Sequence, residues 1–159
     1  MTLAYADALA LLFKPNWAVQ IVDMVLHEVT RHSTPTSAKL GQFVREAKIP
    51  IVATELFKRH QTNLKNDPSG VSTANLGELA IQEAMTTIAM ARPAPTAVFL
   101  FEDHKIARAN FIVPSNCRKI STRAYLQFLE QKGWLESASA IERSAIQAGR
   151  VFSNLRFSD

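Results

Sequence analysis

Cysteine and glycine are scarce in this sequence, and both shortages exclude classes of functional site. The single cysteine, Cys117, cannot form an internal disulfide or a cysteine-based zinc cluster, which suits a reducing compartment. Five glycines leave no P-loop and no glycine-rich dinucleotide-binding motif. The four histidines do not pair with other ligands at metal-binding spacing, and no Ser-His-Asp arrangement has support. Zinc sites, nucleotide-binding loops and serine-hydrolase chemistry are therefore not expected.

Long hydrophobic runs are also absent. No apolar stretch approaches the roughly 18 residues of a membrane span, and the apolar start has no basic leader and carries Asp7. We therefore expect a soluble, cytoplasmic protein with no membrane partner. With 159 residues, 47% of them hydrophobic and 20% charged, residues 1–159 should form a single domain. The net charge of +4 permits an anionic partner such as RNA without requiring one.

What the sequence does contain is an alternation of helical patterns with short apolar runs. The apolar runs predict buried strands at 19–22, 49–55, 96–101 and 111–114. Helical patterns cover 2–13, 24–31, 36–47, 75–91, 104–110, 121–133 and 137–149, and the polar segment 56–75 is expected to be a long connection. Uninterrupted apolar strands between helices are typical of a parallel sheet covered on both faces. The expected fold is a three-layer α/β/α domain with a mainly parallel central sheet.

Acidic side chains recur near the expected strand ends. Glu28 lies about one helical turn after the first strand, Glu78 lies in the first turn of a later helix, and Asp103 ends the third strand. Carboxyl ends of parallel strands form one edge, where ligands usually bind, so these three acids could converge there. Clustered carboxylates would suit Mg²⁺ or Mn²⁺ and would repel one another without it. The alternative stays open that Asp103 caps a helix, that Asn75 and Glu78 form a capping box, and that Glu28 is simply solvated.

Three stretches resemble the PIN-like domain family, the nuclease fold of VapC-type toxins. They are "ADALALLFKPNWAVQIVDMVLHEVTR", "NLGELAIQEAM" and "AVFLFEDHKIARANFIVPSNCRKISTRAYLQFLEQKGWL", and together they cover nearly the whole chain. Glu28 matches an acid in a V-x-x-E-V-like helix, and Glu78 matches the acid of a G-E motif. Glu102 and Asp103, ahead of Ala107-Arg108, match a D-D-x-x-A-R motif. The resemblance implies a PIN-like domain whose metal ligands are Glu28, Glu78 and Asp103, with Glu102 as a peripheral acid.

One family feature is missing from the sequence. PIN-like domains begin with a strand that ends in an acidic ligand, in a motif of the type V-V-D-T-N-V-L, and nothing similar occurs here. Asp7 is a weak candidate for this ligand, because the residues around it predict a helix rather than a strand end. The expectation is therefore a domain without the first strand, which would leave sheet edges open. On this reading, extending the chain upstream should stabilise it.

The resemblance implies an endoribonuclease that hydrolyses RNA phosphodiesters with metal-activated water. It also allows a toxin role with a cognate antitoxin protein, and it implies pairing into homodimers. Basic residues near the acids, above all Arg108 and Arg123, are candidates for holding the RNA phosphates. The alternative is a catalytically impaired PIN-like module that binds RNA or protein, which the missing first Asp favours. A signalling domain of receiver type is set aside, because the expected pair of acids after its first strand is absent.

Overall fold

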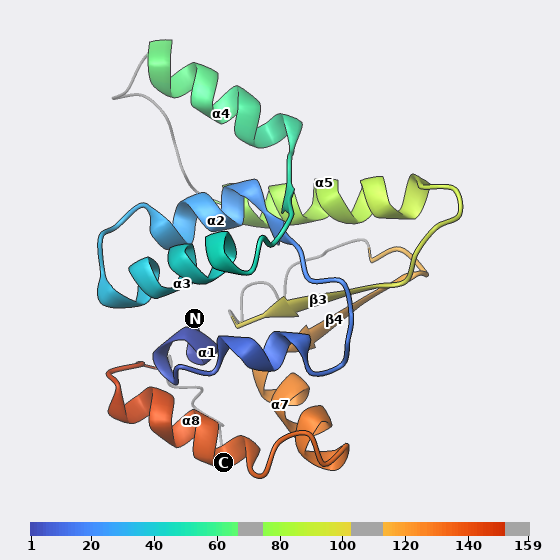
Figure 1. Cartoon of the computed structure of the whole chain (residues 1–159). Helices are drawn as coiled ribbons and strands as arrows, with labels where there is room; N and C mark the ends of the chain where they lie inside the picture. Colours follow the sequence, from blue (N-terminus) through green and yellow to red (C-terminus); the bar gives the residue numbers. More distant parts are fainter. Residues whose placement is uncertain (67–74, 103–112, 152–159) are drawn as a thin grey trace, which may run out of the picture.

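A computed structural model describes residues 1–66, 75–102 and 113–151 of the chain and shows a mixed α/β fold (Figure 1). The helices are α1 (Thr2–Tyr5), the 3-10 helix η1 (Leu9–Phe13), α2 (Asp23–Thr30), α3 (Pro35–Glu46), α4 (Glu55–Asn66), α5 (Leu76–Met90), α7 (Thr122–Gln131) and α8 (Ala138–Gln147). The strands are β1 (Ile21–Val22), β2 (Ile51–Val52), β3 (Ala97–Phe101) and β4 (Cys117–Ser121). The mixed α/β class predicted from the sequence is confirmed.

The four described strands form two separate parallel pairs. In the first pair β1 lies beside β2, with Ile21 opposite Ile51. In the second, β3 lies beside β4, with Ala97 opposite Cys117 and Phe101 opposite Ser121. The predicted parallel direction is therefore found, while the described residues show two small sheets where the sequence predicted one central sheet.

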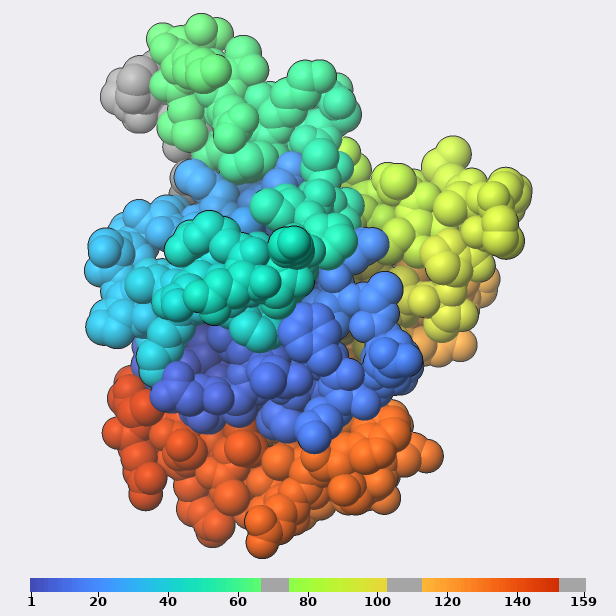
Figure 2. Space-filling model, in the orientation of Figure 1, coloured from blue at the N-terminus to red at the C-terminus, as the bar shows by residue number. Residues whose placement is uncertain are grey.

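Two helix groups lie on either side of the longer sheet in the view of Figure 1. One group contains α2, α3, α4 and α5; α2 packs against α5 and α3, and α5 also contacts β1. The other group contains α1, α7 and α8, and α7 contacts β3 and β4. Figure 2 shows the N-terminal segment, in blue, lying directly against the C-terminal helices, in orange and red. The first helix of the chain and its last described helix, α8, are therefore packed together.

The core of this second group joins the first helix to the last two described helices. Leu3 of α1, Leu126 of α7 and Ala138 of α8 are almost fully buried against one another. Partly buried apolar residues surround them: Ala8, Leu9, Leu11, Leu12, Leu135 and Ile141. The Tyr125 hydroxyl adds a hydrogen bond to the Leu11 carbonyl at 2.8 Å. Burial of this apolar surface stabilises the contact between the first and last helices.

Two of the predicted elements are wrong. The helix predicted over 2–13 is broken between α1 and η1, where Asp7 has a left-handed backbone (φ 54°). The connection predicted over 56–75 instead begins with α4, a helix of 12 residues. Residues 55–66 contain neither glycine nor proline and are rich in good helix formers. Their helix propensity therefore supports α4, although most of these residues are polar.

The second strand of the longer sheet was also misplaced. A strand was predicted at 111–114, of which 111 and 112 lie outside the described residues and 113 and 114 are not in a strand. The observed strand β4 begins at Cys117, after Pro114. Its sequence, CRKIS, contains two adjacent basic residues, so a search for apolar runs does not find this strand.

Candidate functional site

The start of α5 is where two distant acidic positions meet. Glu28, on α2, accepts a hydrogen bond at Oε1 from the backbone N–H of Gly77, at 3.1 Å. A Cβ at position 77 would collide with Oε2 of Glu28, so only glycine lets the carboxylate come this close. A helix N-terminus presents free N–H groups and a positive dipole end, both of which favour a carboxylate. Glu28 is therefore held at the first turn of α5.

Glu78 follows Gly77 in the same turn. Its side chain is half-buried, and it makes no hydrogen bond or ion pair with any residue of the described ranges. The alternative of a capping box formed by Asn75 and Glu78 is not found, because Asn75 has a left-handed backbone (φ 61°) and its side chain makes no cap hydrogen bond. Glu28 takes this role from another helix, so the Glu78 carboxylate is not needed for it. The structure thus brings Glu28 to the turn that carries Glu78.

Of the remaining predicted acids and bases, two lie outside the described residues and two lie in surface ion pairs. Asp103 and Arg108 lie outside the described residues. Arg123 lies in the first turn of α7, where its Nε is 3.7 Å from Glu142 Oε1, and its side chain is largely exposed. Asp7, the weak candidate for a further ligand, pairs with Lys39 at 2.6 Å on the surface. Neither Arg123 nor Asp7 contacts Glu28 or the start of α5 through a hydrogen bond or ion pair.

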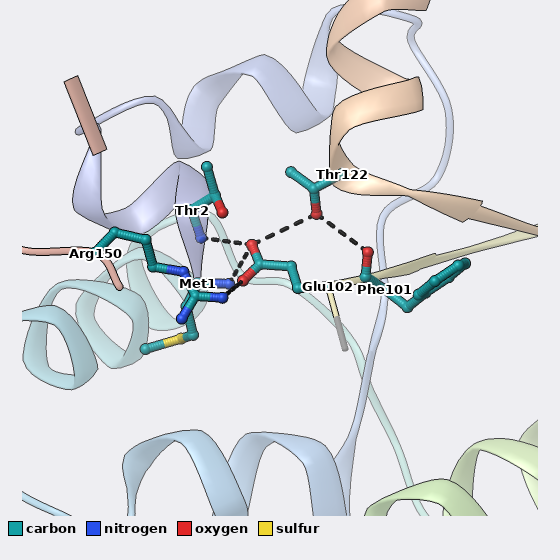
Figure 3. A network of polar contacts seen from close by, with 6 residues as sticks. All are labelled: Met1, Thr2, Phe101, Glu102, Thr122 and Arg150. Carbon is teal, nitrogen blue, oxygen red and sulfur yellow. Dashed lines mark hydrogen bonds and ion pairs between the residues drawn. The ribbon is translucent and has the colours of Figure 1, made fainter. Parts of the chain in front are cut away.

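Glu102 lies at the end of β3 in a network of polar contacts (Figure 3). Its Oε1 accepts from the backbone N–H of Thr2, lies 2.6 Å from the Met1 ammonium group and is 3.4 Å from the Thr122 hydroxyl. Its Oε2 forms an ion pair with Arg150 at 2.9 Å. Both carboxylate oxygens are therefore engaged by cationic or N–H groups. Sequence reasoning treated this residue as a peripheral acid and did not foresee its link to both ends of the chain.

Burial and charge act in opposite directions on Glu102. Its side chain is only 18% exposed, and burial by itself would raise the pKa of the carboxyl group. The Met1 ammonium group, the hydrogen bond from Thr2 and the charge of Arg150 outweigh burial and hold the pKa of Glu102 below its usual value. Glu102 is therefore ionised at neutral pH and acts as the centre of a partly buried charge cluster.

Two acids that the sequence analysis did not select as site residues also bind backbone N–H groups. Asp23, directly after β1, accepts from the Thr54 N–H at 2.7 Å and from the Thr54 hydroxyl at 2.8 Å. Glu83, on α5, accepts from the N–H groups of Glu55 and Leu56 at 2.7 and 3.1 Å. These contacts join β1 to the end of β2 and α5 to the start of α4. The sequence signal for Asp23 was its place after an apolar run, whereas Glu83 had none.

A pocket of about 440 Å³ opens between α4 and α5. It is lined by Glu55, Leu56, Arg59, His60, Asn63, Leu76 and Glu83. Leu76 is the first residue of α5, so the pocket begins beside the turn that holds Glu28 and carries Glu78. Arg59 adds a positive charge to its wall, beside the carboxylates of Glu55 and Glu83.

The donor chemistry of the α5 turn suits a hard divalent cation. Carboxylate oxygens are the side-chain ligands that Mg²⁺ and Mn²⁺ prefer, and Glu28 on α2 and Glu78 on α5 each carry a carboxylate. Within residues 1–66, 75–102 and 113–151, no group of three or more His, Cys, Asp or Glu side chains is arranged to hold a metal ion. The third predicted ligand, Asp103, lies outside these ranges.

No protein-family model matches the chain, and searches of curated proteins and of solved structures also find no match. The PIN-like resemblance therefore rests on the sequence motifs and stays a prediction. Among the described helices, none is both long enough and apolar enough to cross a membrane.

Proposed function

We propose that this chain is a metal-dependent endoribonuclease of the PIN-like class, with its acidic site at the start of α5. The observation that supports it is the contact between Glu28 and Gly77, which are 49 positions apart in sequence. The sequence motifs required these two segments to meet, and no local pattern would bring them together. The proposal includes the three-layer PIN-like arrangement, RNA as substrate, and an antitoxin protein and a second copy of the chain as partners.

In this proposal, Glu28, Glu78 and Asp103 hold a Mg²⁺ or Mn²⁺ ion. When bound, the ion lowers the pKa of a water molecule and stabilises negative charge on the phosphate. The Gly77 N–H fixes the orientation of Glu28, and the positive N-terminal end of α5 would favour the negative charge of the carboxylate and of the RNA phosphate at the same place. Arg59 in the adjoining pocket, and Arg108 and Arg123, would hold the phosphates that the carboxylates repel.

The test is a calorimetric titration of Mn²⁺ into the full chain, followed by cleavage of a labelled RNA with and without a chelator. We expect metal binding and cleavage in the parent chain, and loss of both in Glu28→Gln, Glu78→Ala and Asp103→Asn. Asp7→Asn is the matched control, because Asp7 lies in a surface ion pair with Lys39 and should leave both unchanged. Metal binding that survives in Glu78→Ala would contradict the proposed site.

The Gly77→Ala variant tests the metal site without lowering the stability of the fold. The added methyl group would displace the Glu28 carboxylate, while alanine is favoured over glycine inside a helix by roughly 1 kcal/mol. We expect loss of metal binding with little change in the free energy of unfolding. A Gly77→Ala chain that binds Mn²⁺ as tightly as the parent would show that the orientation of Glu28 is irrelevant to the ion.

The second candidate function is a PIN-like module that binds RNA or protein without cutting. It is favoured by the absence of the acidic ligand that ends the first strand of PIN-like domains, which Glu102 does not replace because its two oxygens are occupied by Met1, Thr2 and Arg150. A carboxylate in this state is not free to bind a metal ion. Absence of Mn²⁺ binding in the parent chain, with RNA binding retained, would select this function over the first.

A further inference from the structure

The two tryptophans of the chain, 117 residues apart, meet on one surface. Trp17, which follows η1, and Trp134, which follows α7, both pack against Phe128 of α7. The Trp17 ring stacks on Phe128, with centroids 5.8 Å apart and planes inclined by 22°. The Trp134 ring meets Phe128 edge-on, at 5.9 Å and 85°. The two indole planes are therefore steeply inclined to each other.

Both tryptophan side chains are much more exposed than is usual for this large apolar residue. Trp17 is 48% exposed and Trp134 is 41% exposed, although tryptophan is a residue type that is highly buried on average. Leaving large apolar rings in water forgoes the stabilisation that burial would provide. An exposed pair of such rings therefore indicates a contact surface rather than an incomplete core.

The backbone holds both rings in place. Trp134 follows Gly133, whose left-handed backbone (φ 69°) ends α7, and the Trp134 N–H donates to the Leu129 carbonyl at 2.9 Å. Trp17 follows Asn16, which is also left-handed (φ 57°) and whose N–H donates to the Phe13 carbonyl at 3.0 Å. Each tryptophan thus leaves a hydrogen-bonded turn in a fixed direction. Such a surface loses little conformational entropy when it binds a partner.

Lys132 adds a positive charge to this surface. Its Nζ lies 5.9 Å from the centre of the Phe128 ring, and its side chain is exposed. An exposed ammonium group beside aromatic rings is the combination that single-stranded nucleic acids bind, because bases stack on the rings and a phosphate pairs with the cation. With one lysine and two indole rings, stacking should contribute more than charge.

We propose that the surface formed by Trp17, Phe128, Lys132 and Trp134 binds single-stranded RNA. Two inclined indole planes fit two bases that are splayed apart, which a single strand allows and a duplex does not. A protein partner would instead favour one continuous apolar face. The choice of RNA as the nucleic acid rests on the proposed function; the stacking surface does not depend on metal binding or cleavage.

The surface lies away from the acidic site. α7 begins directly after the end of β4, and its ten residues span about 15 Å before Lys132 and Trp134. Figure 1 shows α7 running away from the sheet. RNA bound here would be anchored at a distance from the carboxyl ends of the strands, so anchoring and cleavage can be measured separately.

The experiment uses the tryptophan fluorescence of the full chain, because both tryptophans lie in the proposed surface. A single-stranded oligouridine or oligoadenosine of about a dozen nucleotides is titrated in the presence of a chelator. We expect saturable quenching, only weak dependence on salt, and much weaker binding of a duplex of the same length. Trp17→Leu and Trp134→Leu, each followed through the remaining tryptophan, should weaken binding roughly tenfold.

Lys132→Gln should weaken binding several-fold, and Lys65→Gln is its matched control, because Lys65 is an exposed lysine near the end of α4. Trp17→Phe keeps an aromatic ring and should keep most of the affinity, which controls for loss of folding in Trp17→Leu.

RNA binding that leaves the tryptophan fluorescence unchanged, and that none of these variants weakens, would place the RNA elsewhere and overturn the proposal. Absence of RNA binding would also overturn the proposal. So would a dimer that Trp134→Leu dissociates, because the surface would then serve self-association. Because a chelator is present, these results are independent of whether the chain cleaves RNA.

Discussion

At the scale of single residues, Glu102 is the clearest case of an acid whose partners lie far away in sequence. Its carboxylate is bound by residues from both ends of the chain, Met1 with Thr2 on one side and Arg150 on the other. Burial and the charges of those partners together set the pKa of Glu102. The sequence motif "FED" showed an acid at a strand end, but it could not show which groups would face it.

Glu102→Gln should lower the free energy of unfolding by about 2 kcal/mol at pH 7, because it leaves partly buried cations without their counter-charge. The pKa of Glu102 is lower in the folded protein than its usual value of 4.5, so its stabilising contribution is present above that pH and is lost as the pH falls through the folded-state pKa. Urea unfolding at pH 7 and below pH 4 measures this difference.

The matched control is Glu142→Gln. Glu142 pairs with the exposed Arg123 at 3.7 Å, and its loss should cost less than about 0.5 kcal/mol. If the parent chain and Glu102→Gln lose stability in parallel as the pH falls, the charge cluster around Glu102 contributes nothing to the fold.

At the scale of elements, helix starts in this protein are satisfied as much by other helices as by their own caps. Thr34 and Ser121 cap α3 and α7 locally, as their sequences favour. Ser137 caps α8 in the same way, through a hydrogen bond from the Ala140 N–H. The starts of α4 and α5 instead receive carboxylates from Glu83 and Glu28. Local patterns predict the first kind of cap and cannot predict the second.

Glu83→Ala should destabilise the chain by about 1 kcal/mol, because the N–H groups of Glu55 and Leu56 lose their acceptor at the start of α4. Alanine keeps the helix propensity of α5, so the loss reports the contact between the two helices. Hydrogen exchange should accelerate at these two amides first.

Glu46→Ala is the control for this prediction, since Glu46 is an exposed acid at the end of α3 that accepts a hydrogen bond from Gln42, four residues before it. It should change stability by no more than about 0.5 kcal/mol. Equal exchange rates at Glu55 and Leu56 in the parent chain and in Glu83→Ala would show that Glu83 does not protect the start of α4.

At the scale of the whole molecule, the first and last helices share one core. Leu126 of α7 is fully buried between Leu3 and Ala138. Leu126→Ala should therefore cost about 3 kcal/mol through lost burial and the cavity left behind. A single shifted transition in thermal unfolding, seen equally by fluorescence and circular dichroism, would confirm that this core supports the whole chain.

Leu79→Ala is the matched control, because Leu79 on α5 is 53% exposed. Its truncation should change the free energy of unfolding by no more than about 0.5 kcal/mol. A Leu126→Ala chain as stable as Leu79→Ala would mean that the packing of α1 against α7 and α8 is not required for stability.

The sequence by itself determined the α/β class, the parallel direction of the strands and most helices, because apolar runs and helical periodicity are local signals. It located β3 and α5 to within a residue or two, and it missed α4 and β4, whose polar residues resemble a loop. Only the tertiary structure decided which distant residues meet. Glu28 contacts Gly77, and Glu102 contacts Met1 and Arg150, over separations of 48 residues or more. Trp17 and Trp134, which are further apart still, both pack on Phe128. Such contacts depend on how the helices pack around the strands, and no local pattern encodes that packing.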